Sequence, residues 1–214
     1  MPRRLAALSL APVVLLTACS AASGEPSTDP TPVASVPASW LTSTAEGWPD
    51  SDGYGSSAPV LSNADCVLTD EVTVHGATGR TDMSGWGPYG DDTSATDAYR
   101  YVCEFRGDEL SAQLQVIQAG SASDAAQTVD LFLDQPTNGD QENETTTVQL
   151  GDVDVHVNQR WYPKPEYGAA TAMLLDAAAN AVVVLEVTSL EADAFEEYTP
   201  EAVAADLMRA LNQG

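Results

Sequence analysis

The 214-residue chain has very few basic residues, histidines and cysteines. It contains 8 lysine and arginine residues against 32 aspartate and glutamate residues, which gives a formal net charge of −24 at pH 7. A surface of this charge repels phosphate backbones, so the composition argues against nucleic acid as a partner. It also opposes electrostatic docking on anionic lipid. The 2 histidines, His75 and His156, do not have the spacing of a metal site.

The chain also lacks the sequence marks of common enzymes. The nucleophile motif Gly-x-Ser-x-Gly does not occur. Carboxylate pairs are abundant, but 32 acidic residues produce pairs by chance, and no pair is marked by its position as catalytic. The acidic segment after Asp50 fails the EF-hand pattern, because Leu61 stands where that loop needs glutamate. We therefore predict no catalytic residue, no metal site and no cofactor.

Residues 1–19 have the pattern of a secretion signal. Two arginines in residues 1–4 precede an apolar stretch from Leu5 to Leu16, and the sequence Leu-Thr-Ala-Cys follows at residues 16–19. The stretch is too short to span a bilayer, and small residues before a cysteine are typical of a bacterial lipobox. We predict cleavage after residue 18 and attachment of diacylglycerol to Cys19. The membrane is then a partner through this lipid, with the protein on the extracytoplasmic side.

Composition divides the chain into three regions. Residues 1–18 are the predicted lipoprotein signal peptide, and residues 19–62, which are rich in Ser, Pro and Thr, are predicted to be a disordered tether. Residues 63–214 have the size of a single domain. Trp40, Trp48 and Tyr54 interrupt the tether. We expect these aromatic residues to dock on the domain, and a binding motif is the alternative.

The remaining cysteines form a pair. If Cys19 carries the lipid, then Cys66 and Cys103 are left in an oxidising compartment, where two thiols form a disulfide. The alternative, two thiolates that bind a metal, lacks further ligands. The disulfide leaves no free thiol for nucleophilic catalysis.

Hydrophobic periodicity predicts an α+β domain. We expect an antiparallel sheet of about six strands, with two main helices packed on one face. The region from 82 to 98 and the acidic region from 136 to 146 are predicted to be loops. The expected strands cover 100–105, 110–116, 148–150, 153–159, 170–175 and 182–187, and the expected helices are a short one from Thr69, one from Ser121 or Ser123 to about Gln135, and one from Thr199.

Aromatic residues suggest a ligand-contact surface. Trp86 and Tyr89 stand between glycines, an arrangement in which exposed rings stack on sugars or peptides. The alternative is that both rings pack on the core near the disulfide and contact no ligand. Trp161 and Lys164 follow a predicted strand and would lie beside this loop, with Lys164 as the single lysine of the chain.

Several of these features together resemble a known group of proteins. The opening from Asp65 to Val72, with Cys66 and Thr69, the second cysteine in Cys103-Glu104-Phe105, and the closing strand and helix from Ala181 to Leu211 are similar to actinobacterial cell-envelope lipoproteins. Those proteins carry a small disulfide-containing domain of unknown function. The resemblance covers 63–214 and implies the disulfide and the location, but no catalytic residue. This chain departs from the pattern in its long insertion before Cys103 and in its acidity.

We therefore expect a membrane-anchored extracytoplasmic lipoprotein whose domain is not catalytic. It would bind a small ligand, a cell-envelope component or another envelope protein. Two other classes remain open: an envelope hydrolase that uses carboxylates, and a calcium-binding module. For the second class, the acidic groups at 91–92 and 191–197 would supply the ligands.

Overall fold

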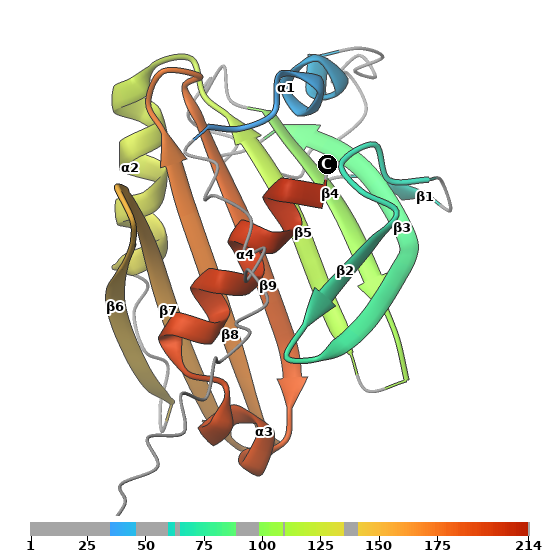
Figure 1. Ribbon diagram of the computed structural model, residues 1–214, viewed down its shortest axis with the longest axis vertical. Helices are drawn as coiled ribbons and strands as arrows, with labels where there is room; N and C mark the ends of the chain where they lie inside the picture. Colours follow the sequence, from blue (N-terminus) through green and yellow to red (C-terminus); the bar gives the residue numbers. More distant parts are fainter. Residues whose placement is uncertain are drawn as a thin grey trace, which may run out of the picture.

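A computed structural model describes residues 35–45, 60–62, 65–88, 99–108, 110–134 and 141–213. These residues form an antiparallel sheet with helices packed against it, which confirms the predicted α+β class (Figure 1). In chain order the elements are α1 (Ala38–Ala45), β1 (Val60–Ser62), β2 (Glu71–Val74), β3 (Ala77–Pro88), β4 (Tyr99–Arg106), β5 (Ser111–Gln118), α2 (Ala122–Leu133), β6 (Glu142–Leu150), β7 (Val153–Pro163), β8 (Glu166–Asp176), β9 (Ala181–Leu190), α3 (Ala192–Glu197) and α4 (Pro200–Gln213).

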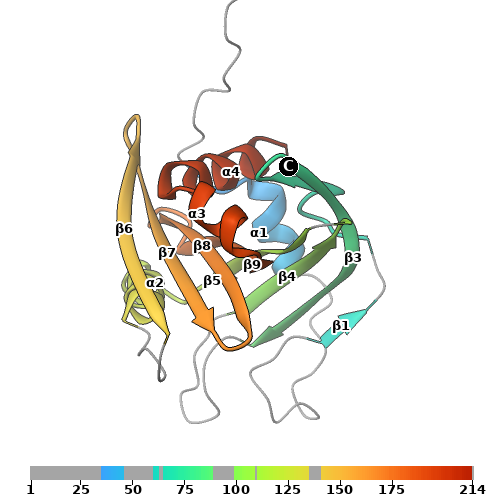
Figure 2. The same ribbon diagram turned by 90° about the horizontal axis from the view of Figure 1, so that it is seen from below.

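The sheet consists of two meanders that meet in its middle. Its strand order is β1-β3-β4-β5-β9-β8-β7-β6, and β2 also pairs with β3. The contact between β5 and β9 joins the meander β3–β4–β5 to the meander β6–β7–β8–β9. The sheet curls into a half-barrel, with α1, α3 and α4 inside the curve and α2 outside it (Figure 2). We call the inner side the concave face and the outer side the convex face.

The described strands number nine, whereas about six were predicted. One added strand, β2, replaces the short helix expected from Thr69. The Thr69 hydroxyl donates to the Glu71 carbonyl at 3.0 Å and does not cap a helix. His75 and Gly76, with φ of 47° and 78°, turn β2 directly into β3. Two successive residues with positive φ are the requirement of a two-residue type I′ hairpin, so the turn chemistry outweighs the helix-cap signal.

Two predicted loops are partly strand. Residues 82–88 belong to β3 and pair with β4, and residues 142–146 belong to β6 and pair with β7. Both segments are rich in glycine or in polar residues, which lowers strand propensity. Pairing with an apolar neighbouring strand supplies the stability that the local sequence lacks.

The concave face carries the main core. Helix α4 crosses it diagonally over the strands (Figure 1), and its predicted apolar stripe is buried. From the sheet, alternate residues of β9 contribute to the same core. The stripe consists of Val203, Leu207, Ala210 and Leu211, and the β9 residues of this core are Ala181, Val183, Leu185 and Val187.

The second main helix lies on the other face, so the prediction that both helices share a face is wrong. Ala125 and Val129 of α2 form a separate cluster with Val182 and Val184 of β9 and with Met173 of β8. The physical reason is visible in β9, where all five residues from Ala181 to Leu185 are fully buried. A continuous apolar strand is one that is covered on both faces.

Helix α1 attaches the N-terminal part of the described chain to the domain. It lies within the range predicted as a tether, and Trp40 is only 1% exposed in the core of the concave face. The Val36 amide donates to Asp176 Oδ2 at 2.9 Å, and Asp176 Oδ1 accepts from the amides of Ala178 and Ala179. One buried carboxylate thus ties α1 to the β8–β9 turn. Trp48, Tyr54 and Cys19 lie outside the described residues.

The predicted disulfide is confirmed. Cys66 and Cys103 are bonded, with Cα atoms 5.7 Å apart and a sequence separation of 37. The bond joins the segment before β2 to the centre of β4. Structural disulfides persist in oxidising compartments, which indicates an extracytoplasmic location. Within the described ranges, no helix is long and apolar enough to cross a membrane.

Candidate ligand-binding cleft

An open cleft of about 590 Å³ lies at one end of the half-barrel. Its two sides are the ends of β6 and β7 and the segment that runs from α3 into α4. This is the end of the sheet at which α3 lies in Figure 1. The lining residues are Glu142, Asn143, Glu144, Gln159, Trp161, Phe195, Glu196, Tyr198, Thr199 and Pro200.

Strand register places the β6 and β7 side chains of the cleft. Glu142 pairs with Trp161, and Glu144 pairs with Gln159. Directly opposed residues of an antiparallel pair point to the same face, and alternate residues of one strand share a face. Val157, two residues before Gln159, lies in the concave core. All four cleft residues therefore project to the concave side, beyond the end of the core.

An aromatic pair forms one wall. The rings of Trp161 and Phe195 have centroids 5.4 Å apart and are tilted by 40°. Phe195 lies directly over Gly168 of β8, where an added Cβ would be 2.2 Å from Phe195 Cδ2. A glycine is required at this position because any side chain would displace the ring. Both aromatic side chains are half-buried, so each keeps an accessible part in the cleft.

The back of the cleft is held by hydrogen bonds around Tyr198. Gln159 Nε2 donates to the Tyr198 carbonyl at 2.6 Å, which ties the α3–α4 connection to β7. The buried Tyr198 hydroxyl donates to Asp206 Oδ2 at 2.9 Å. Burial, together with the Asp206 carboxylate, raises the pKa of Tyr198 far above its ordinary value, so the hydroxyl remains a neutral donor.

The cleft has an excess of negative charge. Glu142, Glu144 and Glu196 are exposed, and none of them forms an ion pair or side-chain hydrogen bond in the part of the chain that the structure describes. Among the described residues, no lysine, arginine or histidine lines the cleft. The start of α4 at Thr199 and Pro200 contributes a partial positive charge of about one half. Three carboxylates outweigh that charge, so the cleft attracts cations.

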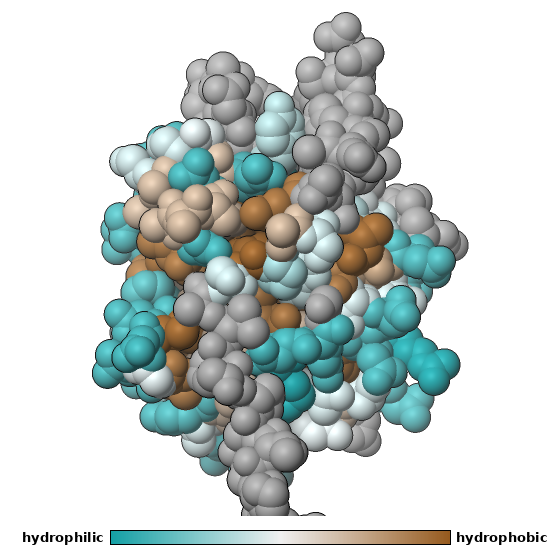
Figure 3. Space-filling model, turned by 45° about the horizontal axis from the view of Figure 1, so that its top comes forward, coloured by the Kyte–Doolittle hydropathy of each residue, from teal (hydrophilic) through white to brown (hydrophobic). Residues whose placement is uncertain are grey.

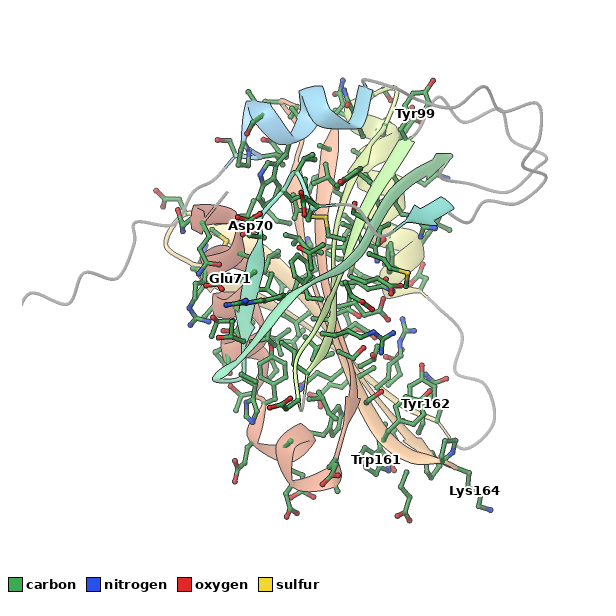
Figure 4. The ribbon with its side chains drawn as sticks, turned by 90° about the vertical axis from the view of Figure 1, so that its right-hand side faces the viewer. Asp70, Glu71, Tyr99, Trp161, Tyr162 and Lys164 are labelled. Carbon is green, nitrogen blue, oxygen red and sulfur yellow. A yellow bond between two sulfur atoms is a disulfide. The ribbon has the colours of Figure 1, made fainter. Side chains whose placement is uncertain are left out.

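Of the predicted ligand-contact residues, Trp161 alone lines the cleft among those that the structure describes. Lys164 is exposed in the β7–β8 turn, three residues away, and does not line it. Figure 4 shows Trp161, Tyr162 and Lys164 gathered at this end of the molecule. The backbone of Trp86 belongs to β3, but its side chain lies outside the described set, as does all of Tyr89.

The structure separates the two predicted aromatic segments. Trp86 and Trp161 lie on strands that are five positions apart in the sheet, which is about 24 Å at the usual strand spacing. Strand pairing also places Trp86 level with Val155, six residues from Trp161 along β7. The two segments therefore cannot form one contact surface.

Glu142, Glu144, Phe195 and Tyr198 were not predicted as site residues from the sequence. One signal was available for β6. The alternation of Val148 and Leu150 continues backwards through positions 146, 144 and 142, which places the glutamates on the face of the valine. No comparable signal existed for Phe195 and Tyr198, because the α3–α4 connection meets β7 only in three dimensions.

A second cleft, of about 550 Å³, lies on the other side of α3. Its floor is apolar and its rim includes His75, Arg106 and Glu191. Arg106 is already engaged, because its Nε donates to Asp82 Oδ2 at 2.9 Å. Among the described residues, no group of three or more His, Cys, Asp or Glu side chains is arranged to hold a metal ion in this cleft or elsewhere.

Few large apolar side chains are exposed in the part of the chain that the structure describes. On the side seen in Figure 3, apolar residues occur in patches interrupted by hydrophilic ones. Among the described residues, Val67, Tyr99 and Leu131 are the large apolar side chains that are exposed, and they belong to different segments. Scattered single apolar residues are normal on soluble domains.

Comparisons with family models, curated proteins and solved structures found no match for this chain.

Proposed function

We propose that this protein is a non-catalytic binding domain, anchored to the extracytoplasmic face of the membrane through Cys19, that takes an organic cation in the cleft between β6–β7 and α3–α4. One observation carries the proposal: an aromatic wall of Trp161 and Phe195 stands beside three carboxylates without an ion-pair partner among the described residues. The disulfide and the N-terminal sequence support the location. The resemblance to actinobacterial cell-envelope lipoproteins agrees with it.

The chemistry of the cleft favours an amine or guanidinium group with an apolar neck. A cation over the face of a tryptophan ring gains about 0.5–2 kcal/mol, according to how dry the site is. Carboxylates nearby add attraction that falls as ionic strength rises. Phosphate and carboxylate ligands would be repelled. The volume of about 590 Å³ lies within the range of small-molecule sites, roughly 300–1,000 Å³.

The same arrangement suits binding better than hydrolysis. Glu142, Glu144 and Glu196 face water. A carboxylate that works as a general acid is commonly placed in an apolar, water-poor pocket. Exposed carboxylates instead provide a charged rim for a ligand that arrives from solution.

A titration tests the proposal. The mature chain, residues 19–214 in detergent micelles, is titrated with spermidine and with arginine amide while the indole N–H signal of Trp161 is followed by NMR. We expect both cations to shift this signal, with weaker binding at higher salt. Glutarate, a dianion of similar size, serves as the control and should not shift it. The Trp161→Phe variant assigns the signal.

Substitution of the ring adds a second measurement. Trp161→Leu keeps an apolar side chain against Phe195 but removes the indole face, so we expect a loss of roughly 2- to 30-fold in the affinity for arginine amide. Calorimetry measures this loss, and thermal melting checks that the variant is folded. The proposal is overturned if neither cation shifts the Trp161 signal at millimolar concentration.

A further inference from the structure

Strand β6 is an open edge of the sheet. It ends the strand order, and among the described strands it pairs with β7 alone. Alternate residues of an edge strand direct their backbone N–H and C=O groups away from the sheet. Edge strands are usually protected by charged side chains, above all lysine, by proline or by short length. β6 has nine residues, contains neither proline nor lysine, and carries only two charges, Glu142 and Glu144, whereas β1 at the other edge has only three residues.

The acidic half of β6 adjoins the cleft. Val148 and Leu150 pack toward the concave core, while Glu142 and Glu144 extend beyond it along the same face. A strand added to β6 would lie about 4.8 Å from it and would point every second side chain to that face. Those side chains would pass over the two glutamates, and the longest of them would reach toward Trp161 on β7.

Charge decides what such a strand can be. A second copy of this chain would bring two acidic edges together, and each chain carries a net charge of −24. The chain's own segment from 19 to 62 contains neither lysine nor arginine, so it cannot neutralise the cleft. The complementary occupant is a basic segment of a different polypeptide.

We propose that β6 receives an extended segment of another protein as an additional strand, and that alternate Lys or Arg side chains of this segment enter the acidic cleft. The inference rests on the proposed function, since the cleft supplies the cation site. Backbone pairing with β6 gives affinity, and the alternating cations give specificity. The partner is therefore a polypeptide and not a free amine.

Three synthetic heptapeptides of equal charge test the pairing. The parent has the sequence Lys-Thr-Lys-Thr-Lys-Thr-Lys with blocked ends, and its two derivatives carry N-methyl groups on every lysine or on every threonine. Residues of one parity in a strand direct all their amides to one edge. We therefore expect one methylated peptide to lose at least tenfold in affinity, while the other stays within about threefold of the parent.

Two outcomes overturn the inference and remain distinguishable. If both methylated peptides bind as well as the parent, edge pairing is wrong and the cation cleft stands. If neither the peptides nor arginine amide shifts the Trp161 signal, the cleft proposal fails as well.

Matched variants locate the contact on the protein. Glu142→Gln with Glu144→Gln removes two charges at the cleft, and Asp152→Asn with Asp154→Asn removes two exposed charges at the far end of the same hairpin. We expect the first pair to weaken binding of the parent peptide at least tenfold, and the second pair less than twofold. Equal weakening by both pairs would indicate unspecific charge attraction and would contradict the inference. Circular dichroism and melting verify that both variants are folded.

Discussion

Asp206 connects α4 to two distant parts of the chain. Its Oδ2 accepts from the His75 amide at 2.8 Å and from the Tyr198 hydroxyl, and its Oδ1 accepts from Arg209. Arg209 also donates to the Thr73 carbonyl at 3.2 Å. The carboxylate is only 6% exposed, so its negative charge is stabilised by these donors and not by water. This residue positions the β2–β3 hairpin and the back of the cleft together.

Replacement of this carboxylate should be severe. Asp206→Ala leaves a buried hydroxyl and a backbone amide without an acceptor, and we expect a loss of about 3 kcal/mol in the free energy of unfolding. Tyr198→Phe removes only one hydrogen bond to a charged group and should lose about 1.5–3 kcal/mol. Urea denaturation measures both. A change below about 0.5 kcal/mol in Asp206→Ala would contradict the structural role of the carboxylate.

The stability of the fold should depend on pH through Glu186 of β9. Burial raises the pKa of this carboxyl above the value of 4.5, and the nearby charges of Arg160 and Arg100 offset only part of that rise. A raised pKa in the folded state means that the protonated form stabilises the fold. This contribution is fully present below pH 4.5 and is lost as the pH rises through the folded-state pKa.

Glu186→Gln should therefore be more stable than the parent at pH 7, with a difference that shrinks toward pH 4. Melting temperatures at the two pH values give the comparison. Glu71→Gln, at an exposed position of β2 (Figure 4), is the control and should show no such trend. A variant that is less stable than the parent at pH 7 would mean that the two arginines outweigh the burial.

Residue-level prediction from sequence succeeded where the signal was local. Of the two predicted starts of α2, Ser121 and Ser123, it is Ser121 that caps the helix, because its Oγ accepts from the Asp124 amide at 3.2 Å. Cys66 and Cys103 form the disulfide that was expected once Cys19 was assigned to the lipid. The burial of Asp206 could not be predicted from the sequence, because an acidic residue inside an amphipathic helix normally lies on the solvent side of the helix. Its partner His75 lies 131 residues away.

At the scale of elements, the position of α3 depends on the missing side chain of Gly168. Gly168→Ala would place a methyl group against three atoms of Phe195, at 2.2, 2.5 and 2.9 Å. The ring must move, and α3 moves with it. We expect a loss of about 1–3 kcal/mol in stability, together with weaker binding of arginine amide.

A double-mutant cycle identifies the cause of this loss. Phe195→Ala removes the clashing ring, so Gly168→Ala should be much less destabilising in that background. An equal loss in both backgrounds would show that the backbone of Gly168, and not its contact with Phe195, sets the requirement.

The elements were predictable where one face of a strand is polar. The hairpin of β4 and β5 and the turn from β6 into β7 were found from alternation and turn residues. The first half of β6 was missed because Glu142 and Glu144 lie on the part of the concave face that extends beyond the apolar core. The helix placement was wrong because β9 is apolar on both sides, so periodicity could not show which face each helix covers.

For the whole molecule, the disulfide should be a major source of stability. A cross-link that closes a loop of 37 residues restricts the unfolded chain, and we expect its removal to lower the free energy of unfolding by about 3–4 kcal/mol. The double variant Cys66→Ser with Cys103→Ser, compared with the parent by urea denaturation, measures this. Added reductant should weaken the parent and leave the variant unchanged.

The anchor has a test of its own in cells. Cys19→Ala removes the proposed site of lipid attachment, so we expect the protein to leave the membrane fraction. Fractionation followed by immunoblotting compares it with the parent. Parent and variant found equally in the membrane fraction would contradict lipid attachment at Cys19.

The docking of α1 also sets how far, and in which direction, the domain can extend from the bilayer. If Cys19 is held in the lipid, the tether between the membrane and the domain ends at Ser35, where the described chain meets the domain. A tether of sixteen residues spans at most about 55 Å. A tether that continued to Ser62 would span at most about 150 Å. The hydrogen bond from the Val36 amide to Asp176 holds the end of the tether near the β8–β9 turn. The cleft lies toward the opposite end of the half-barrel, beside α3 (Figure 1). With Cys19 in the lipid, the domain would be attached at the end that lacks the cleft, and the acidic cleft would open away from the membrane.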